Sequence, residues 1–347
     1  MSTAREVIMA CAAGSTWGTA VSCNTASSAF FATDVTNFVA VPEELPDESV
    51  GFNYLEYIDA GNVIVEPVLR GHLRYTTALW RLLAWAIGDD SAALVSGSDY
   101  DHTMDIQATT SLFGTLCAYD GVVVREIPSF QPNGFTLSGE SGQFWQYEVR
   151  GRGDNILVSS QTNTTLSSAT HVSNTLRAPF GASTIRINDQ SGSSLASGDT
   201  VYLNAFSFNF QRAQVGEFLS NAVAEGSGEF RTRQPAEDGR PTIEITMRFP
   251  EYSAITYMQD VGDETFKKMD LTITGPTTAS ANNYTITLSF PALRVVNVEH
   301  TISNGNRIVE SLTLRGLSPQ SAPSGMTGIT FPFRLILRDA TSAAYDT

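Results

Sequence analysis

Leu73-Arg74-Tyr75, then twelve residues, then Gly88-Asp89 has a second copy in the chain: Met247-Arg248-Phe249, then twelve residues, then Gly262-Asp263. The copies lie 174 positions apart at both ends, since 247 − 73 and 262 − 88 give the same value. Self-similarity at a long, fixed offset is typical of a duplicated structural unit. We therefore expect two related halves in this chain of 347 residues, which is long enough for two domains.

The residues between the conserved ends of each copy predict a short helix. In the first copy an apolar stripe at helical spacing ends at Gly88, which suits a left-handed stop, and Thr76 or Thr77 can cap its start. In the second copy Pro250 suits the first turn and Gly262 the stop. The stripes are Leu79, Leu82, Leu83, Ala86 and Ile87 in the first copy, and Tyr252, Ile255, Met258 and Val261 in the second.

Alternating apolar and polar residues predict strands on both sides of each helix. Turn residues separate some of them, namely Pro132-Asn133-Gly134 and Ser303-Asn304-Gly305. A last strand is expected over Ile329–Arg338. The three strands after each helix are expected at Val122–Ile127, Phe135–Leu137 and Phe144–Val149, and at Tyr284–Phe290, Leu293–Glu299 and Ile308–Leu314.

Together these patterns predict a mainly β protein with two tandem related domains, each with one flanking α-helix and one long loop. Residues 1–158 form the first domain and 177–347 the second. Residues 159–176 are mostly Ser, Thr and Asn, which is typical of a linker. One long loop begins at Pro42, and the other runs from Asn221 to Pro241.

Composition favours an assembly subunit over a nucleic-acid-binding protein. Only 16% of residues are charged, and the net charge of −15 repels a phosphate backbone overall. Cys11, Cys23 and Cys117 form no close pair, so we expect small buried side chains and not disulfides or a zinc site. No apolar run is long enough to span a membrane, so no membrane partner is expected.

Catalytic and cofactor motifs are absent from the sequence. It contains no phosphate-cradling glycine loop, no G-x-S-x-G elbow and no H-E-x-x-H helix, so we predict no enzyme and no cofactor. One acidic cluster could ligate a hard cation, but Met104 stands where a calcium loop requires glycine, and a solvated turn is favoured. This cluster consists of Asp99, Asp101, His102 and Asp105.

Two related β halves without catalytic chemistry predict self-assembly. The surface that joins half one to half two within a chain resembles the surface that could join half two to the next chain, and such head-to-tail contacts can close into rings. The long loops would then be arms toward neighbouring subunits or rings. Their candidate contact residues are Glu43, Glu44, Asp47, Glu48 and Glu56 in the first loop, and Arg231, Arg233, Glu237, Asp238 and Arg240 in the second.

Several segments resemble the tail tube proteins, or major tail proteins, of long, non-contractile-tailed bacteriophages. They are Thr16-Trp17-Gly18-Thr19-Ala20-Val21, Tyr100-Asp101-His102-Thr103 and Phe135-Thr136-Leu137-Ser138-Gly139-Glu140-Ser141-Gly142. The resemblance implies a β-sandwich or half-barrel in each domain. It also implies trimeric, pseudo-hexameric rings stacked around an acidic channel for genome delivery.

By the same resemblance, the partners are further copies of the chain, tape-measure protein and tail-completion proteins. DNA would pass through the lumen without specific binding, and the tail would be assembled in the host cytoplasm and become part of the virion. Two alternatives stay open. The chain could be another virion or appendage protein, such as a capsid decoration or adhesin, or a carbohydrate-binding module or hydrolase that uses Trp80, Trp85 or Trp145.

Overall fold

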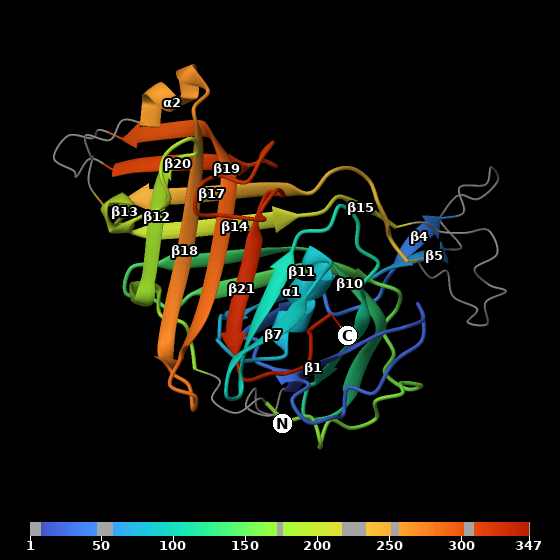
Figure 1. Cartoon of the computed structure of the whole chain (residues 1–347). Coiled ribbons are helices and arrows are strands. Elements are labelled where there is room, and N and C mark those ends of the chain that lie inside the picture. The colour runs from blue at the N-terminus through green and yellow to red at the C-terminus, as the bar shows by residue number, and fades with distance from the viewer. Residues whose placement is uncertain are drawn as a thin grey trace.

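The computed structural model describes residues 8–46, 58–171, 176–216, 234–250, 257–301 and 309–346. Strands dominate these residues, and two α-helices accompany them, which confirms the mainly β fold (Figure 1). All pairs between named strands of the main sheet network are antiparallel. The two short 3-10 turns are Phe180–Ala182 and Ser197–Asp199.

Seven strands from the first half form a continuous run of neighbours. Their order is β2, β1, β9, β10, β11, β6 and β3. We call this run the first strand set. Its bounds are β1 Ile8–Ala13, β2 Ala29–Phe30, β3 Asp34–Thr36, β6 Val68–His72, β9 Gly114–Tyr119, β10 Val124–Glu140 and β11 Gln146–Gly153.

Seven strands from the second half form a run with the same order. The neighbours are β13, β12, β18, β19, β20, β17 and β14, which repeats the first strand set position by position. We call this run the second strand set. Its bounds are β12 Ser183–Asp189, β13 Thr200–Val201, β14 Ala205–Gln211, β17 Thr242–Phe249, β18 Phe266–Thr277, β19 Asn283–Thr301 and β20 Val309–Gly316.

The two strand sets are joined at two strand edges. β14 of the second set pairs with the later part of β10 of the first, from Gly134–Gln211 to Glu140–Ala205. At the other junction β21 (Arg334–Asp339) pairs with both β19 and β8 (Asp99–Asp105), and β7 (Ser91–Ser96) completes this run. The expected last strand is thus present but begins at residue 334, since residues 329–333 are not in a strand.

The two long loops begin as paired strands. β4 (Val41–Pro46) pairs with β5 (Ile58–Ile64) between β3 and β6, and β15 (Gln214–Val215) pairs with β16 (Ala236–Glu237) between β14 and β17. The loops therefore leave the two strand sets at equivalent places, and the strands β4, β5 and β15 lie toward the same end of the molecule (Figure 1). We call residues 37–64 the first arm and residues 212–240 the second arm.

The first predicted helix is confirmed as α1 (Leu79–Ile87), which packs on β10 and ends at Gly88 with a left-handed φ of 101°. The predicted threonine cap is wrong, because Ala78 holds the N-cap position and no side chain caps it. Helix α2 (Tyr257–Asp263) passes through Gly262, so the predicted stop there is wrong as well. Glu264, with φ of 53°, is the left-handed residue that follows α2. Pro250 is not helical, and Tyr252 and Ile255 lie outside the described residues.

β10 and β19 are each one long strand where the sequence predicted two. The expected turn at Pro132-Asn133-Gly134 is instead a bulge inside β10, where the register against β11 shifts. Bulges add a residue and bend a strand without ending it. This bend allows β10 to pair with β9 along its first part and with β14 along its last. Ser303-Asn304-Gly305 lies outside the described residues.

Aromatic side chains form a core that is shared by both strand sets. Phe135 of β10 packs against Phe208 and Phe210 of β14, with ring centroids 5.6 and 5.3 Å apart. Trp80 and Trp85 are fully buried beside them in α1, and so is Trp145. Since none of the three indoles is exposed, they offer no stacking platform for a sugar.

The Ser/Thr/Asn-rich segment 159–176 packs against the first strand set in its described part. Leu166 is buried with Cys23 and Cys117, and all three cysteines are buried and free, which confirms their predicted role as small apolar side chains. The buried Glu126 carboxylate accepts hydrogen bonds from the backbone N–H groups of Thr162 and Asn163, at 3.0 and 2.7 Å. These bonds fix the start of the segment to β10.

Candidate assembly interface

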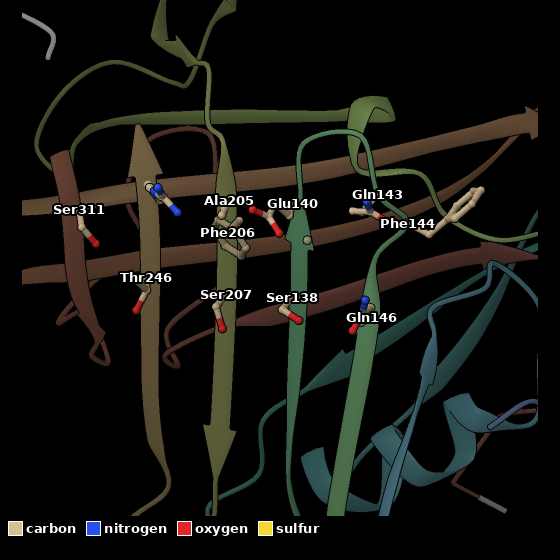
Figure 2. A pocket seen from close by; sticks show the side chains of 12 residues that line it. Ser138, Glu140, Gln143, Phe144, Gln146, Ala205, Phe206, Ser207, Thr246 and Ser311 are labelled. Atoms are coloured by element: carbon tan, nitrogen blue, oxygen red, sulfur yellow. The ribbon is translucent and has the colours of Figure 1, made fainter. Parts of the chain in front are cut away.

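A polar face runs across five neighbouring strands, from β11 through β10, β14 and β17 to β20. Alternation in these strands turns Phe135, Phe208 and Ile245 into the core and leaves short polar side chains on the opposite face. Ser138 is paired with both Gln146 and Ser207, and Ser207 with Thr246. Figure 2 shows this row of side chains, which with Ser311 lines a shallow depression of about 340 Å³.

Several charges on and beside this face are paired within the chain. The Arg70 guanidinium contacts Glu148 at 2.6 Å and Asp34 at 3.2 Å, and Arg150 also contacts Glu148. Hydrogen bonds from Arg70 and Arg150 lower the pKa of Glu148, although burial alone would raise it. In the next strands, Glu244 lies directly opposite Arg315.

Arg212, at the start of the second arm, is a buried clasp between the two strand sets. Its guanidinium donates to the backbone carbonyls of Ala86 and Ile87 at the end of α1, at 2.6 and 2.7 Å. It also contacts the Glu237 carboxylate at 3.1 Å. Burial lowers the pKa of Arg212, while Glu237 opposes this. Further carbonyl acceptors are Gln107 and Ala108.

β8 and β21 are held together by two bidentate ion pairs. Arg334 contacts Asp105 at 2.6 and 2.7 Å, and Arg338 contacts Asp101 at 2.7 and 2.8 Å. The expected solvated turn around these aspartates is wrong, because the whole cluster lies on β8. No group of three or more metal-ligating side chains occurs in the described ranges of the chain.

The buried His102 fastens the C-terminal tail to β8. Its Nδ1 lies 2.9 Å from Asp90, and its Nε2 lies 2.8 Å from the Thr341 carbonyl and 3.3 Å from Asp339. Burial alone would lower the pKa of His102, but hydrogen bonds to the Asp339 and Asp90 carboxylates raise it to about 10. The hydroxyl of Tyr345, in the tail, donates to Asp339 at 2.5 Å.

The edges of β3 and of the end of β19 are among those that have no partner strand in the described residues. β3 is paired with β6 along one edge only. The end of β19, from Val295 onward, is paired with β20 along one edge, because the pairing with β18 stops at Arg294. Unpaired edges are templates for adding a strand from another chain.

The predicted arm residues are distributed unevenly over the described structure. Glu43 and Glu44 are exposed on β4, and Asp238 and Arg240 are exposed after β16. Glu237 differs, since its carboxylate faces inward to Arg212 and accepts the Thr110 N–H at 2.6 Å. The five remaining candidates all lie outside the described residues, namely Asp47, Glu48, Glu56, Arg231 and Arg233.

Sequence reasoning missed three buried polar residues, Arg212, Glu126 and His102 in its tail-binding role. The only signal for Arg212 was its place directly after the alternating Phe206, Phe208 and Phe210, where the next inward position would be apolar. Glu126 carried no signal, because its partners Thr162 and Asn163 are 36 and 37 residues away in the chain. The tail contact of His102 carried none either, because Thr341 is 239 residues away.

These features define a structural β protein, in which buried polar groups hold strands, hairpins and the C-terminal tail together. The chain belongs to the phage tail tube protein family, whose model matches residues 11–336. It is thus a bacteriophage structural protein of the virion tail, as the sequence resemblance indicated. No helix in the described part of the chain has the length and apolar character needed to cross a membrane.

Other comparisons add little. No curated protein matches the chain. Among solved structures, the crystal structure of an Hcp protein is similar over 38% of this chain and 86% of its own, with 11% sequence identity and a TM-score of 0.21. A likeness at this level is too remote to carry a functional argument.

Proposed function

We propose that the protein is the repeating subunit of a phage tail tube, and that three copies form a pseudo-hexameric ring. Rings of this kind would stack around a channel for genome delivery. The proposal rests on one observation, namely that the two strand sets have the same order and are already joined edge to edge by β10 and β14. The same junction can recur between chains and close a ring.

Equivalent registers identify the expected inter-chain strand pair. Leu69 is paired with Val35 and Ile243 with Phe210, and the 174-residue offset makes Val35 the counterpart of Phe210. Likewise Val149 is paired with Phe135 and Leu314 with Val295.

Since Val149-Arg150-Gly151 matches Leu314-Arg315-Gly316, Val295 is the counterpart of Phe135. Phe135 pairs with Phe210 within the chain. We therefore expect Val295 to pair with Val35 of the next copy, along the two open edges.

The polar face is the proposed wall of the channel. Its short serine and threonine side chains and its paired charges would let DNA pass without specific binding. The resemblance implied an acidic channel, whereas acidic and basic groups alternate on this face. Much of the acidic excess lies in residues 41–64, which contain six acidic residues and neither Lys nor Arg. Tape-measure and tail-completion proteins, and assembly in the host cytoplasm, remain part of the proposal.

Electron microscopy of the purified protein tests the tube directly. Hollow tubes of uniform width are expected after incubation at high concentration, whereas a capsid decoration protein or adhesin would form none. A second test replaces Asp34 and Asn297 by cysteine, because their counterparts Asn209 and Thr136 are paired within the chain. Oxidation should then link chains covalently up to a closed trimer.

The matched control combines Asp34→Cys with Thr313→Cys, which lies beside Asn297 but on β20, away from the open edge. Equal cross-linking in the two pairs, or solid aggregates without a lumen, would contradict the proposed ring.

A further inference from the structure

The second arm is fastened to the first strand set near the end of α1. Arg212 binds the last α1 carbonyls, and Gln234 donates to the Ser111 carbonyl at 2.9 Å just before β9. Ile87, the last residue of α1, is fully buried beneath this contact. The base of the second arm therefore covers the place where helix, β9 and β10 meet.

At the equivalent place in the second strand set, the described apolar side chains are exposed. The 174-residue offset makes Val261 the counterpart of Ile87, yet Val261 is 38% exposed. Phe266, at the start of β18, is 40% exposed, and Val296 of β19 is 45% exposed. Phe266 is paired with Arg294, two residues before Val296, and α2, which carries Val261, packs on β19.

A depression in the surface lies next to Phe266. It measures about 630 Å³, and its lining includes Phe266, Ala292 and Leu317. Within the first strand set the corresponding region is occupied by the second arm, whereas nothing in the described residues of the chain fills this one. A single chain thus contains one covered copy and one open copy of the same receptor.

The base of the first arm has a matching apolar surface. Since Val35 is the counterpart of Phe210, Asn37 is the counterpart of Arg212 at the start of the arm. Just beyond it, Val39 is 48% exposed and Val41 is 55% exposed. Ile64, paired with Val41 across the hairpin, is 45% exposed. Three neighbouring aliphatic side chains in water mark a surface suited to contact with a partner.

We propose that the base of the first arm, through Val39, Val41 and Ile64, docks onto Val261, Phe266 and Val296 of the next copy of the chain. This contact rests on the proposed ring. It would lie between chains at the place equivalent to the one that the Arg212 clasp occupies within a chain. The two contacts differ in chemistry. The internal clasp is made of buried hydrogen bonds, whereas the contact between chains is apolar and can form by desolvation when free subunits meet.

Aspartate substitutions test the contact. Val39→Asp and Val41→Asp should each raise the protein concentration needed for ring assembly at least tenfold, because the contact would then bury a carboxylate among apolar groups. Both side chains are exposed in the free chain, so thermal unfolding of the subunit should be unchanged. The matched control is Val122→Asp, at an exposed valine in the turn before β10 that should leave assembly unaffected.

Cross-linking distinguishes this contact from ring formation as such. With Val39→Cys and Val261→Cys in one chain, a short bismaleimide should join neighbouring copies, while the buried native cysteines stay unreactive. The control pair is Val122→Cys with Val261→Cys.

Rings that form normally with Val39→Asp and give no link between residues 39 and 261 would overturn the docking contact and leave the ring intact. A wild-type chain that stays monomeric at all concentrations would overturn both.

Discussion

Arg212 shows how one side chain can hold two halves of a molecule together. Every N–H group of its guanidinium has an acceptor. Four of these acceptors are backbone carbonyls, and the fifth is a carboxylate. Its positive charge also lies at the C-terminal end of α1, where the helix dipole favours a cation. The desolvation of this arginine is thus compensated by contacts that only the folded chain provides.

We expect Arg212→Met to lower the free energy of unfolding by about 3–5 kcal/mol, since it leaves buried carbonyls and the Glu237 carboxylate without their donor. Urea denaturation of the unassembled subunit measures this loss. Arg240→Met, at an exposed arginine of the same arm, is the control and should change stability by less than about 0.5 kcal/mol. Equal stabilities of the two variants would show that the clasp contributes nothing.

His102 makes stability depend on pH. Its folded-state pKa of about 10 lies above the 6.5 of an unperturbed histidine, so the stabilisation is complete below pH 6.5 and is lost as pH rises toward 10. The groups that face it are the carboxylates of Asp90 and Asp339 and the hydroxyl of Tyr345, whose own pKa is raised by burial.

Urea denaturation at pH 6, 8 and 9.5 should therefore show falling stability for the wild type and a weaker dependence for His102→Gln. A wild-type profile that is flat over this range, or identical in the variant, would mean that His102 is neutral in the folded chain.

At the scale of elements, the sequence was informative where a signal was local and failed where a distant partner decided the outcome. Leu79–Ile87 and Gly88 predicted α1 correctly, because the stripe and its stop lie within one segment. Pro132-Asn133-Gly134 reads as a turn by composition, yet pairing with β11 and β14 on both sides keeps the chain extended there.

The proposed interface between chains could also be predicted from the sequence only in part. The repeat indicated that two halves could meet end to start, and the acidic loop indicated an exposed arm. Which strand edges are open could not be derived, because β3 and the end of β19 look like other alternating segments until their partners are known. The contact of Glu237 with Arg212 could not be predicted for the same reason, since Arg212 lies 25 residues earlier.

The end of α2 offers a test of backbone strain. Glu264 adopts a φ of 53°, a conformation that glycine accepts more readily than residues with a Cβ atom. Glu264→Gly should therefore be more stable than Glu264→Gln by about 1 kcal/mol. Both variants remove the exposed ion pair between Glu264 and Arg294, so the comparison isolates the backbone. Thermal unfolding of the two proteins provides the measurement, and a glutamine variant of equal or higher stability would argue against strain at this position.

At the scale of the whole molecule, we expect the acidic residues of the first arm to take part in contacts between stacked rings. Residues 41–64 contain six acidic residues and no lysine or arginine, and the strands β4, β5 and β15 at the bases of the two arms lie toward the same end of the molecule (Figure 1). In a ring with all subunits in one orientation, the acidic hairpins would be presented together to the next ring. Their apolar bases would act within the ring, and their acidic parts between rings.

The double substitution Glu43→Gln and Glu44→Gln should therefore shorten tubes without preventing ring formation, because it weakens only the attraction between stacked rings. Tube lengths in electron micrographs, and the mass of the soluble ring, measure the two effects separately. Added salt should shorten wild-type tubes in the same way, since exposed charges are screened over about 8–10 Å. Glu140→Gln, an exposed acid at the end of β10, is the matched control. Longer tubes in the double variant would mean that the acids of neighbouring arms repel one another, and that stacking depends on another surface.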